Sequence, residues 1–218
     1  MLKVASKSHY YKWTTYRRIL LDQLQEKHKY LYKGIILDIG GRDRGGFIKP
    51  KDKVEKWIFA DINVEYNPDI VLDITNMTQI SSNSIDVINA MELFEHVEDI
   101  SSGLKECYRV LKKNGVLLIS TPFLYHIHTD PHDFQRWTNT KWKNELTKLG
   151  FKIEKIIIMS RYFTVLGDML KSLIKSFLKI FKYLGFLLFR ILDRIVRLDN
   201  TFFIKKMFNY TVFMADTS

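Results

Sequence analysis

An apolar run that ends in a carboxylate and two glycines is the clearest chemical signal in the sequence. Residues 35–39 are apolar except for Asp38, and Gly40 and Gly41 follow, where the lack of a Cβ lets a ligand approach the backbone. A second apolar run ends about twenty residues later at Asp61. An acid at this position can accept hydrogen bonds from the two hydroxyl groups of a ribose. The spacing therefore predicts a nucleoside cofactor.

The residues after the two glycines narrow the kind of nucleoside. The dinucleotide fingerprint Gly-x-Gly-x-x-Gly is absent, and Arg42, Asp43 and Arg44 stand where small residues would let a pyrophosphate lie against a helix N-terminus. A site without this cradle is poorly suited to NAD. It suits a nucleoside that carries no phosphate, of which S-adenosylmethionine is the commonest in enzymes.

A second group of reactive side chains lies within residues 125–133. It contains three histidines and two carboxylates, namely His126, His128, Asp130, His132 and Asp133. We interpret it as the region that meets the acceptor, and a general base, a metal site and a hydrogen-bonded structural loop are its open alternatives. The spacing fits no known metal motif and Arg136 would oppose a cation, so we predict no metal. If a base acts here, His128 is the first candidate and His126 the second, because imidazole has a pKa near ~6.5.

Composition limits the class of protein. A chain of 218 residues with 46% apolar and 14% aromatic residues fits one α/β domain and excludes general disorder. Cys107 is its single cysteine, which excludes a disulfide framework and a cysteine-rich zinc site. The net charge of +10 is concentrated at residues 1–33 and 168–198, and the segment between them is nearly neutral. Residues 1–33 have no apolar core of a signal peptide, so we expect a cytoplasmic protein.

The apolar periodicity predicts alternating strands and helices after a first helix over about residues 8–31. Strands are expected at 34–40, 56–62, 70–74, 85–91, 115–121, 152–159 and 210–214, and further helices at 99–112 and 138–149. This order predicts an α/β, Rossmann-like, doubly wound and mostly parallel seven-stranded sheet. A long amphipathic helix, broken near Gly185, is expected at 168–198, before the last strand.

The order of several short motifs resembles the class I S-adenosylmethionine-dependent methyltransferases over roughly residues 34–160 and the last strand. The motifs are Leu37-Asp38-Ile39-Gly40-Gly41, Phe59-Ala60-Asp61-Ile62, Val71-Leu72-Asp73-Ile74, Leu93-Phe94-Glu95-His96-Val97 and Arg109-Val110-Leu111-Lys112-Lys113-Asn114-Gly115. The last two are the most specific. The stretch from His128 to Thr138 resembles a subgroup common among enzymes of cell-surface polysaccharide and lipid biosynthesis. One departure is Arg42, which replaces the second glycine of the family's usual loop.

The resemblance implies a contact for each strand end. Asp38, Gly40 and Gly41 would approach the methionine half of S-adenosylmethionine, although a strand-end aspartate can also simply cap a turn. Asp61 and Ile62 would contact the ribose. Asp73 and Ile74 would contact the adenine edge, and Met91 and Glu92 the sulfonium. Arg109 is expected to brace its own helix through a carboxylate.

The activity expected from the resemblance is methyl transfer to an oxygen or nitrogen of a small-molecule, sugar or lipid-linked glycan acceptor. A nucleic-acid methyltransferase is one alternative, because a net charge of +10 suits phosphate contacts. Against it, Ser120-Thr121-Pro122-Phe123 is not the Asn/Asp-Pro-Pro-aromatic motif of base methylation, so nucleic acid is not the expected partner. A catalytically silent module that keeps the fold for binding is the other alternative.

Three segments are expected along the chain. They are a basic N-terminal helix at 1–33, the methyltransferase domain at 34–162 and 199–218, and an amphipathic helical insertion at 163–198. The insertion has a basic and an apolar face, so an anionic membrane surface, the domain's own core or a second copy of the chain could cover it. Its longest uncharged run, 183–189, is far shorter than the ~20 residues that span a bilayer. Peripheral attachment to the inner face of the membrane is therefore one expectation.

Overall fold

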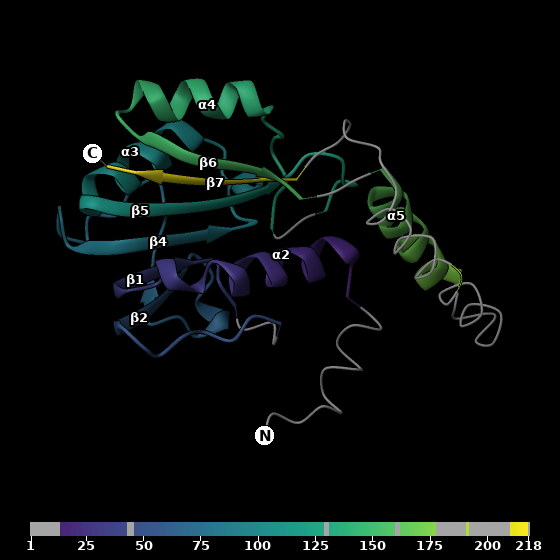
Figure 1. Cartoon of the computed structure of the whole chain (residues 1–218), viewed down its shortest axis with the longest axis horizontal. Coiled ribbons are helices and arrows are strands. Elements are labelled where there is room, and N and C mark those ends of the chain that lie inside the picture. The colour runs from purple at the N-terminus through teal and green to yellow at the C-terminus, as the bar shows by residue number, and fades with distance from the viewer. Residues whose placement is uncertain are drawn as a thin grey trace.

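A twisted sheet forms the middle layer of the molecule (Figure 1). The structure, a computed structural model, describes residues 14–42, 46–128, 131–159, 162–177, 191 and 210–217. The strands are β1 (Gly34–Ile39), β2 (Val54–Asp61), β3 (Ile70–Val71), β4 (Ile85–Met91), β5 (Leu111–Pro122), β6 (Lys152–Ile158) and β7 (Tyr210–Asp216). Their order is β3-β2-β1-β4-β5-β7-β6, in which β7 runs antiparallel to its two neighbours and all other pairs are parallel. The predicted α/β, Rossmann-like and mostly parallel sheet is confirmed.

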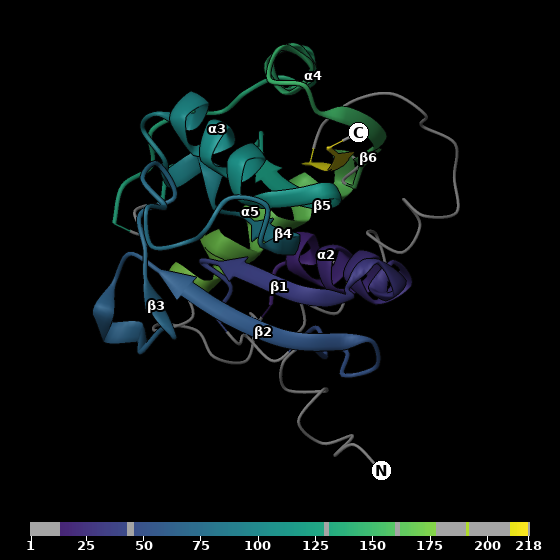
Figure 2. The same ribbon diagram turned by 90° about the vertical axis from the view of Figure 1, so that its left-hand side faces the viewer.

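Helices cover both faces of this sheet. They are α2 (Tyr16–Lys27), α3 (Ile100–Val110), α4 (Asn139–Lys148) and α5 (Tyr162–Phe177), with short 3-10 turns η1 (Lys29–Leu31), η2 (Val64–Tyr66) and η3 (Phe94–His96). Both views show α3 and α4 on one face and α2 on the other (Figures 1 and 2). A sheet covered on two faces needs strands that are apolar on both sides, which explains their nearly continuous apolar sequences.

Side chains on the two faces of the sheet pack in two separate apolar cores. On β1, Leu37 and Ile39 belong to the core that includes Leu104 of α3 and Trp142 of α4. Ile36, which precedes Leu37 and points to the opposite face of the sheet, belongs to the smaller core that includes Leu21 of α2. Because successive strand side chains point to opposite faces, this division follows directly from the sequence.

Helix α2 is shorter than the sequence predicts. Thr15 caps its start, with Oγ1 accepting the Arg18 N–H at 3.2 Å, and the helix ends at Lys27. The ring of His28 then contacts the Leu24 carbonyl oxygen through Nδ1 at 2.9 Å, which satisfies a carbonyl of the last turn. The chain continues as η1 instead of an α-helix. The first part of the predicted helix, residues 8–13, lies outside the described residues.

The third strand is also shorter than the predicted span 70–74, because β3 contains only Ile70 and Val71. Asp73 bends the chain by accepting the Thr75 N–H at 2.8 Å and makes an isolated bridge with Asn76. An aspartate that bonds to the backbone two residues onward favours a turn over a strand.

Helix α5 begins at Tyr162, six residues before the predicted start, and is described to Phe177. Ile191 is helical, and the rest of the expected helix, including Gly185, lies outside the described residues. Among the helices that are described, none has the length and apolar character needed to cross a bilayer.

The carboxyl ends of the parallel strands lie on the side of the sheet where α5 is found (Figure 1). The loops after β1, β2, β4 and β5 therefore share one edge. In open α/β sheets this is the edge at which ligands bind. The predicted site residues lie at the carboxyl ends of these strands or in the loops that follow them or β3.

Candidate functional site

The loop after β1 needs glycine at two positions. Gly40 has a φ of +69°, a conformation that side chains rarely adopt, and its N–H donates to the Ala60 carbonyl oxygen at 2.8 Å. A Cβ on Gly41 would collide with the Asp38 carboxylate. The loop therefore folds closely over Asp38, and the double glycine is what permits this.

Asp38 is held by groups of the protein itself. Its side chain is buried, with the residue 1% exposed. Oδ1 accepts a hydrogen bond from Asn89 Nδ2 at 2.6 Å, and Oδ2 accepts one from Trp57 Nε1 at 2.8 Å. Lys49 Nζ lies 3.1 Å from Oδ2. Burial raises the pKa of Asp38, and the Lys49 ammonium is the main opposing influence. Asp38 therefore holds the loop in place. The Lys49 ammonium lies at the position beside the Asp38 carboxylate where a cationic group of a ligand could approach.

A pocket opens beside this loop, between α2, the middle of β2 and the carboxyl ends of β1 and β4. Of the predicted cofactor contacts, Asp38, Gly40, Gly41 and Met91 line it. The other lining residues are Arg18, Asp22, Gln25, Arg42, Gly46, Phe47, Lys49, Trp57 and Asn89. The Arg42 guanidinium stacks on the Tyr66 ring, 3.9 Å from its centre. The arginine in the second-glycine position is thus accommodated by an aromatic neighbour.

Asp61 and Ile62 lie at the end of β2, outside the lining of that pocket. Asp61 is mostly buried and its Oδ1 accepts the Asn63 N–H at 2.9 Å. No contact of the second carboxylate oxygen is found among the described residues. Ile62 is 61% exposed at the same edge. The pair is therefore placed where a ligand at the sheet edge could contact both side chains.

The pair after β3 is placed differently from the prediction. Oδ1 of Asp73 accepts both the N–H and the hydroxyl of Thr75 at 2.8 Å, so this oxygen serves the local turn. Ile74 is buried in the larger core and packs near Gly103 of α3. Its side chain belongs to the hydrophobic core and is not brought to the pocket.

Glu92 does not present an uncompensated negative charge, in contrast to the expectation for a residue beside a sulfonium. It follows β4 with a φ of +55°, unusual for a residue other than glycine. Its carboxylate pairs with the guanidinium groups of Arg17 and Arg18, both from α2. The Arg17 guanidinium also stacks on the Tyr125 ring at 4.5 Å. These contacts connect α2 to the loops after β4 and β5.

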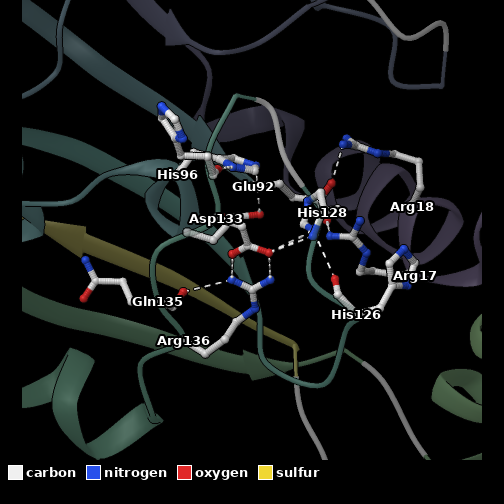
Figure 3. Close-up of polar contacts among 11 residues, drawn as sticks. Arg17, Arg18, Glu92, His96, His126, His128, Asp133, Gln135 and Arg136 are labelled. Atoms are coloured by element: carbon white, nitrogen blue, oxygen red, sulfur yellow. Dashed lines mark hydrogen bonds and ion pairs between the residues drawn. The ribbon is translucent and has the colours of Figure 1, made fainter.

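The predicted acceptor loop gathers around one ion pair (Figure 3). Asp133 accepts the His128 N–H at 2.9 Å and forms a two-point ion pair with Arg136. The Arg136 guanidinium lowers the pKa of Asp133 to about 2. Burial lowers the pKa of His128 below its usual value, which favours the neutral imidazole. The His126 ring stacks near Tyr125, with centres 4.2 Å apart.

Two residues of the predicted cluster, Asp130 and His132, are not among the side chains that the structure describes around this ion pair. Asp130 lies outside the described residues. The backbone carbonyl oxygen of His132, and not its ring, contacts the His96 imidazole at Nδ1. His96 in turn brings its ring to His128, with centres 5.1 Å apart.

Glu95 is a residue that the predicted site set does not contain. It is 1% exposed, and both carboxylate oxygens lack a hydrogen-bond partner within the described structure. Burial, with the Glu92 carboxylate as the next cause, raises the pKa of Glu95 to about 8. The nearest cation-forming atom is Nε2 of His96, 3.9 Å from Oε1.

Comparison with known proteins identifies the fold family of this site. The family model for a methyltransferase domain matches residues 51–119. A ubiquinone biosynthesis O-methyltransferase from Actinobacillus pleuropneumoniae serotype 7 (strain AP76) is 29% identical over 119 residues, covering 46% of this chain and 51% of that protein. Residues 51–119 therefore resemble a methyltransferase domain, in line with the sequence motifs. The chain spans about half the length of the curated relatives that it matches.

Solved structures share the fold of this methyltransferase domain at low sequence identity. The [4+2]-cyclase SpnF matches with a TM-score of 0.60 and 14% identity, covering 94% of this chain and 83% of SpnF. Phosphoethanolamine N-methyltransferase 2 of Haemonchus contortus, in complex with S-adenosyl-L-methionine, matches with a TM-score of 0.54 and 16% identity, covering 93% and 52% of the two chains. These likenesses concern the fold.

Most of the pocket lining was not predicted from the sequence. The residues concerned include Arg18, Lys49, Trp57 and Asn89. Asn89 carries the one usable signal, because it is a polar residue within the apolar strand β4 and must find a buried partner. Lys49 and Arg18 carry none, since their types are common on surfaces.

Proposed function

We propose that this chain is an S-adenosylmethionine-dependent methyltransferase that acts on an oxygen or nitrogen of a small-molecule, sugar or lipid-linked glycan acceptor. The observation that carries the proposal is the pocket beside Gly40 and Gly41 at the carboxyl end of β1, within a methyltransferase domain. The relative named as a ubiquinone O-methyltransferase favours oxygen as the methylated atom.

The residues present fit this cofactor. Gly41 lets the loop fold against Asp38, because a Cβ there would collide with the Asp38 carboxylate, and Gly40 and Gly41 both line the pocket. Met91 lines the pocket, Asp61 has one carboxylate oxygen to offer a ribose, and Lys49 and Arg18 are cations suited to a carboxylate group. The bound cofactor supplies a methyl group on a sulfonium. The protein's own contribution is alignment, worth up to ~7–11 kcal/mol when the geometry is well set.

On the acceptor side, His128 is the residue proposed to take a proton from the acceptor, with His126 as second choice. A neutral imidazole is required for this, and burial of His128 favours that form. The His128 N–H bond to Asp133, itself fixed by Arg136, holds the histidine in place. A positioned base contributes 10²–10⁴ in rate in typical cases.

A catalytically silent module is the main alternative, because the fold is shared with a protein named as a [4+2]-cyclase and therefore does not by itself imply methyl transfer. Binding of S-adenosylmethionine without transfer to any acceptor would favour it. A nucleic-acid acceptor is the second alternative. It has no observation in its favour beyond the net charge of +10.

We further propose that the protein works at the inner face of an anionic membrane, as a peripheral protein. Support comes from α5, where Tyr162, Leu166, Met169 and Leu173 form an exposed apolar stripe at helical spacing. The protein should co-sediment with phosphatidylglycerol vesicles at low salt. Leu173→Glu should weaken this co-sedimentation, whereas Glu154→Gln, an exposed polar change, should not. A second copy of the chain is the competing occupant. Concentration-dependent dimerisation that Leu173→Glu abolishes, without vesicle binding, would favour it.

The experiment for the activity uses methyl-labelled S-adenosylmethionine and separate pools of lipid, polysaccharide, nucleic acid, protein and small metabolites. The proposal predicts label in the lipid, polysaccharide or small-metabolite pool. Label confined to nucleic acid or protein, or no label in any pool, would contradict it.

A further inference from the structure

Three potential metal-ligating side chains meet where the loop after β4 contacts the loop after β5. They are Glu95 and His96 of η3 and His128 of the acceptor loop. One ligand atom from each lies within 4.8 Å of the other two. In a tetrahedral site with bonds of about 2.0–2.1 Å, such atoms are roughly 3.3 Å apart. Small rotations of the three side chains would close the difference.

Glu95 gives the independent reason to place a cation here. Its carboxyl group is buried and has no hydrogen-bond partner among the residues described, although buried polar groups in proteins are almost always partnered. Leaving such a group unpaired in the interior is costly. Oε1 faces Nε2 of His96 at 3.9 Å, so the unpartnered carboxyl is directed into the cluster.

The contacts of the two histidines indicate which ring nitrogen carries the proton. Nδ1 of His96 contacts the His132 carbonyl oxygen, and Nδ1 of His128 lies 3.3 Å from the His126 carbonyl oxygen and 3.4 Å from Asp133 Oδ2. Each of these partners can only accept a hydrogen bond, so we assign the proton to Nδ1 in both rings. Each Nε2 then keeps a free lone pair. Histidines that bind metals are typically oriented in this way, by a carbonyl or carboxylate on the other nitrogen.

The cations around the cluster are already compensated. Arg17 and Arg18 pair with Glu92, and Arg136 pairs with Asp133 (Figure 3). These pairs answer the sequence-based argument that Arg136 would oppose a metal ion. Among the acids of this region that the structure describes, Glu95 is the one left to neutralise a bound cation.

We propose that Glu95, His96 and His128 bind one divalent transition-metal ion, such as Zn²⁺, Mn²⁺ or Fe²⁺. Two imidazoles and one carboxylate favour these ions over Mg²⁺ and Ca²⁺, which prefer oxygen ligands alone. Three protein ligands leave a coordination position open, as catalytic metal sites do. This reverses the sequence-based prediction that the chain has no metal site.

The open position gives the ion a place in the proposed reaction. An acceptor hydroxyl bound there would lose its proton to water more readily, so the metal-loaded protein would use the ion where the metal-free protein would use His128 as a base. This last step rests on the proposed function, whereas binding of the ion does not.

Cobalt(II) titration of the full chain, stripped with a chelator, tests the site without any assay of activity. We expect one ion per chain, with the visible absorption of a low-coordinate cobalt site, and displacement by Zn²⁺ in calorimetry. Glu95→Gln keeps the shape of the side chain and should weaken binding by roughly 100-fold or more, since even outer partners of metal ligands contribute 10–100-fold. His132→Ala is the matched control. It removes a neighbouring ring but keeps the carbonyl that contacts His96, so its affinity should equal that of the wild type.

If Glu95→Gln fails to fold, as judged by circular dichroism, His128→Gln in the loop replaces it with the same expectation. Failure of the wild type to bind cobalt or zinc would overturn the proposal, as would equal affinity in Glu95→Gln or in His128→Gln. Loss of binding in His132→Ala would overturn the ligand set. S-adenosylmethionine affinity, measured on the same samples, separates this outcome from failure of the proposed function.

Discussion

Asp168 of α5 caps α2, a helix that begins 152 residues earlier, by accepting the Tyr16 N–H at 2.6 Å. It also accepts the Arg17 N–H at 3.1 Å, and the Lys171 ammonium lies over the Tyr16 ring. The first N–H groups of a helix have no partner within it, and a carboxylate there is favoured by the helix dipole. Together with the Thr15 cap, this buried side chain therefore holds the start of α2 and, with it, the arginines that pair with Glu92.

Replacing this cap should lower the stability of the protein. We expect Asp168→Ala to reduce the free energy of unfolding by about 1–2 kcal/mol, the upper range for loss of a helix cap. Met169→Gln, at an exposed neighbouring position of α5, should change it by less than about 0.5 kcal/mol. Urea unfolding followed by circular dichroism measures both. Equal effects of the two substitutions would show that the cap contributes nothing specific.

Arg109 should be a structural residue with no influence on cofactor affinity. Its guanidinium donates to Glu106 and to the carbonyl oxygens of Met77 and Ile80, which joins α3 to the segment between β3 and β4. This confirms the expectation that it braces its helix through a carboxylate. We expect Arg109→Met to cost about 1–3 kcal/mol of unfolding free energy, the scale of hydrogen bonds to a charged group. Calorimetric affinity for S-adenosylmethionine should stay unchanged. A weaker affinity at temperatures where the variant is folded would argue against the structural role.

In the metal-free protein, His128 should govern the rate and its dependence on pH. Because burial lowers its pKa, His128 is protonated only below the usual range of ~6.5, so kcat should rise with pH through an ionisation below that value. His128→Ala should lower kcat by about 10²–10⁴ and leave cofactor affinity intact. His132→Ala, an exposed histidine of the same loop, is the control for kcat. A pH profile that is the same in His128→Ala and in the wild type would favour a purely structural loop.

The elements that local chemistry determines could be predicted from the sequence. The sequence predicts a helix at 138–149, and α4 is capped by Thr138 and followed by Gly150 at a φ of +96°. The strand ends that carry Asp38 and Asp61 were expected from apolar runs that stop at a carboxylate. In each case, neighbours in sequence supply the cause.

The parts that could not be predicted depend on partners far apart in the chain. Glu92 is an acid at a strand end, and nothing near it in sequence indicates that two arginines 74 and 75 residues away neutralise it. Glu95 lies one residue from His96 in a motif that reads as a polar turn, and only the packing of η3 shows that its carboxyl is buried without a partner. Ile74 was paired with Asp73 because they are adjacent, but the turn at Asp73 directs Ile74 into the core.

Titration calorimetry with S-adenosylmethionine tests the central claim most directly, using the wild type, Asp61→Ala and Glu65→Ala. Asp61 ends β2 with one oxygen bonded to Asn63, whereas Glu65 is an exposed acid four residues further on. We predict binding by the wild type and by Glu65→Ala with the same affinity, and a loss of roughly 1.5–3 kcal/mol in Asp61→Ala, the scale of hydrogen bonds to a charged group. Absence of binding by the wild type, or an unchanged affinity in a folded Asp61→Ala protein, would contradict it.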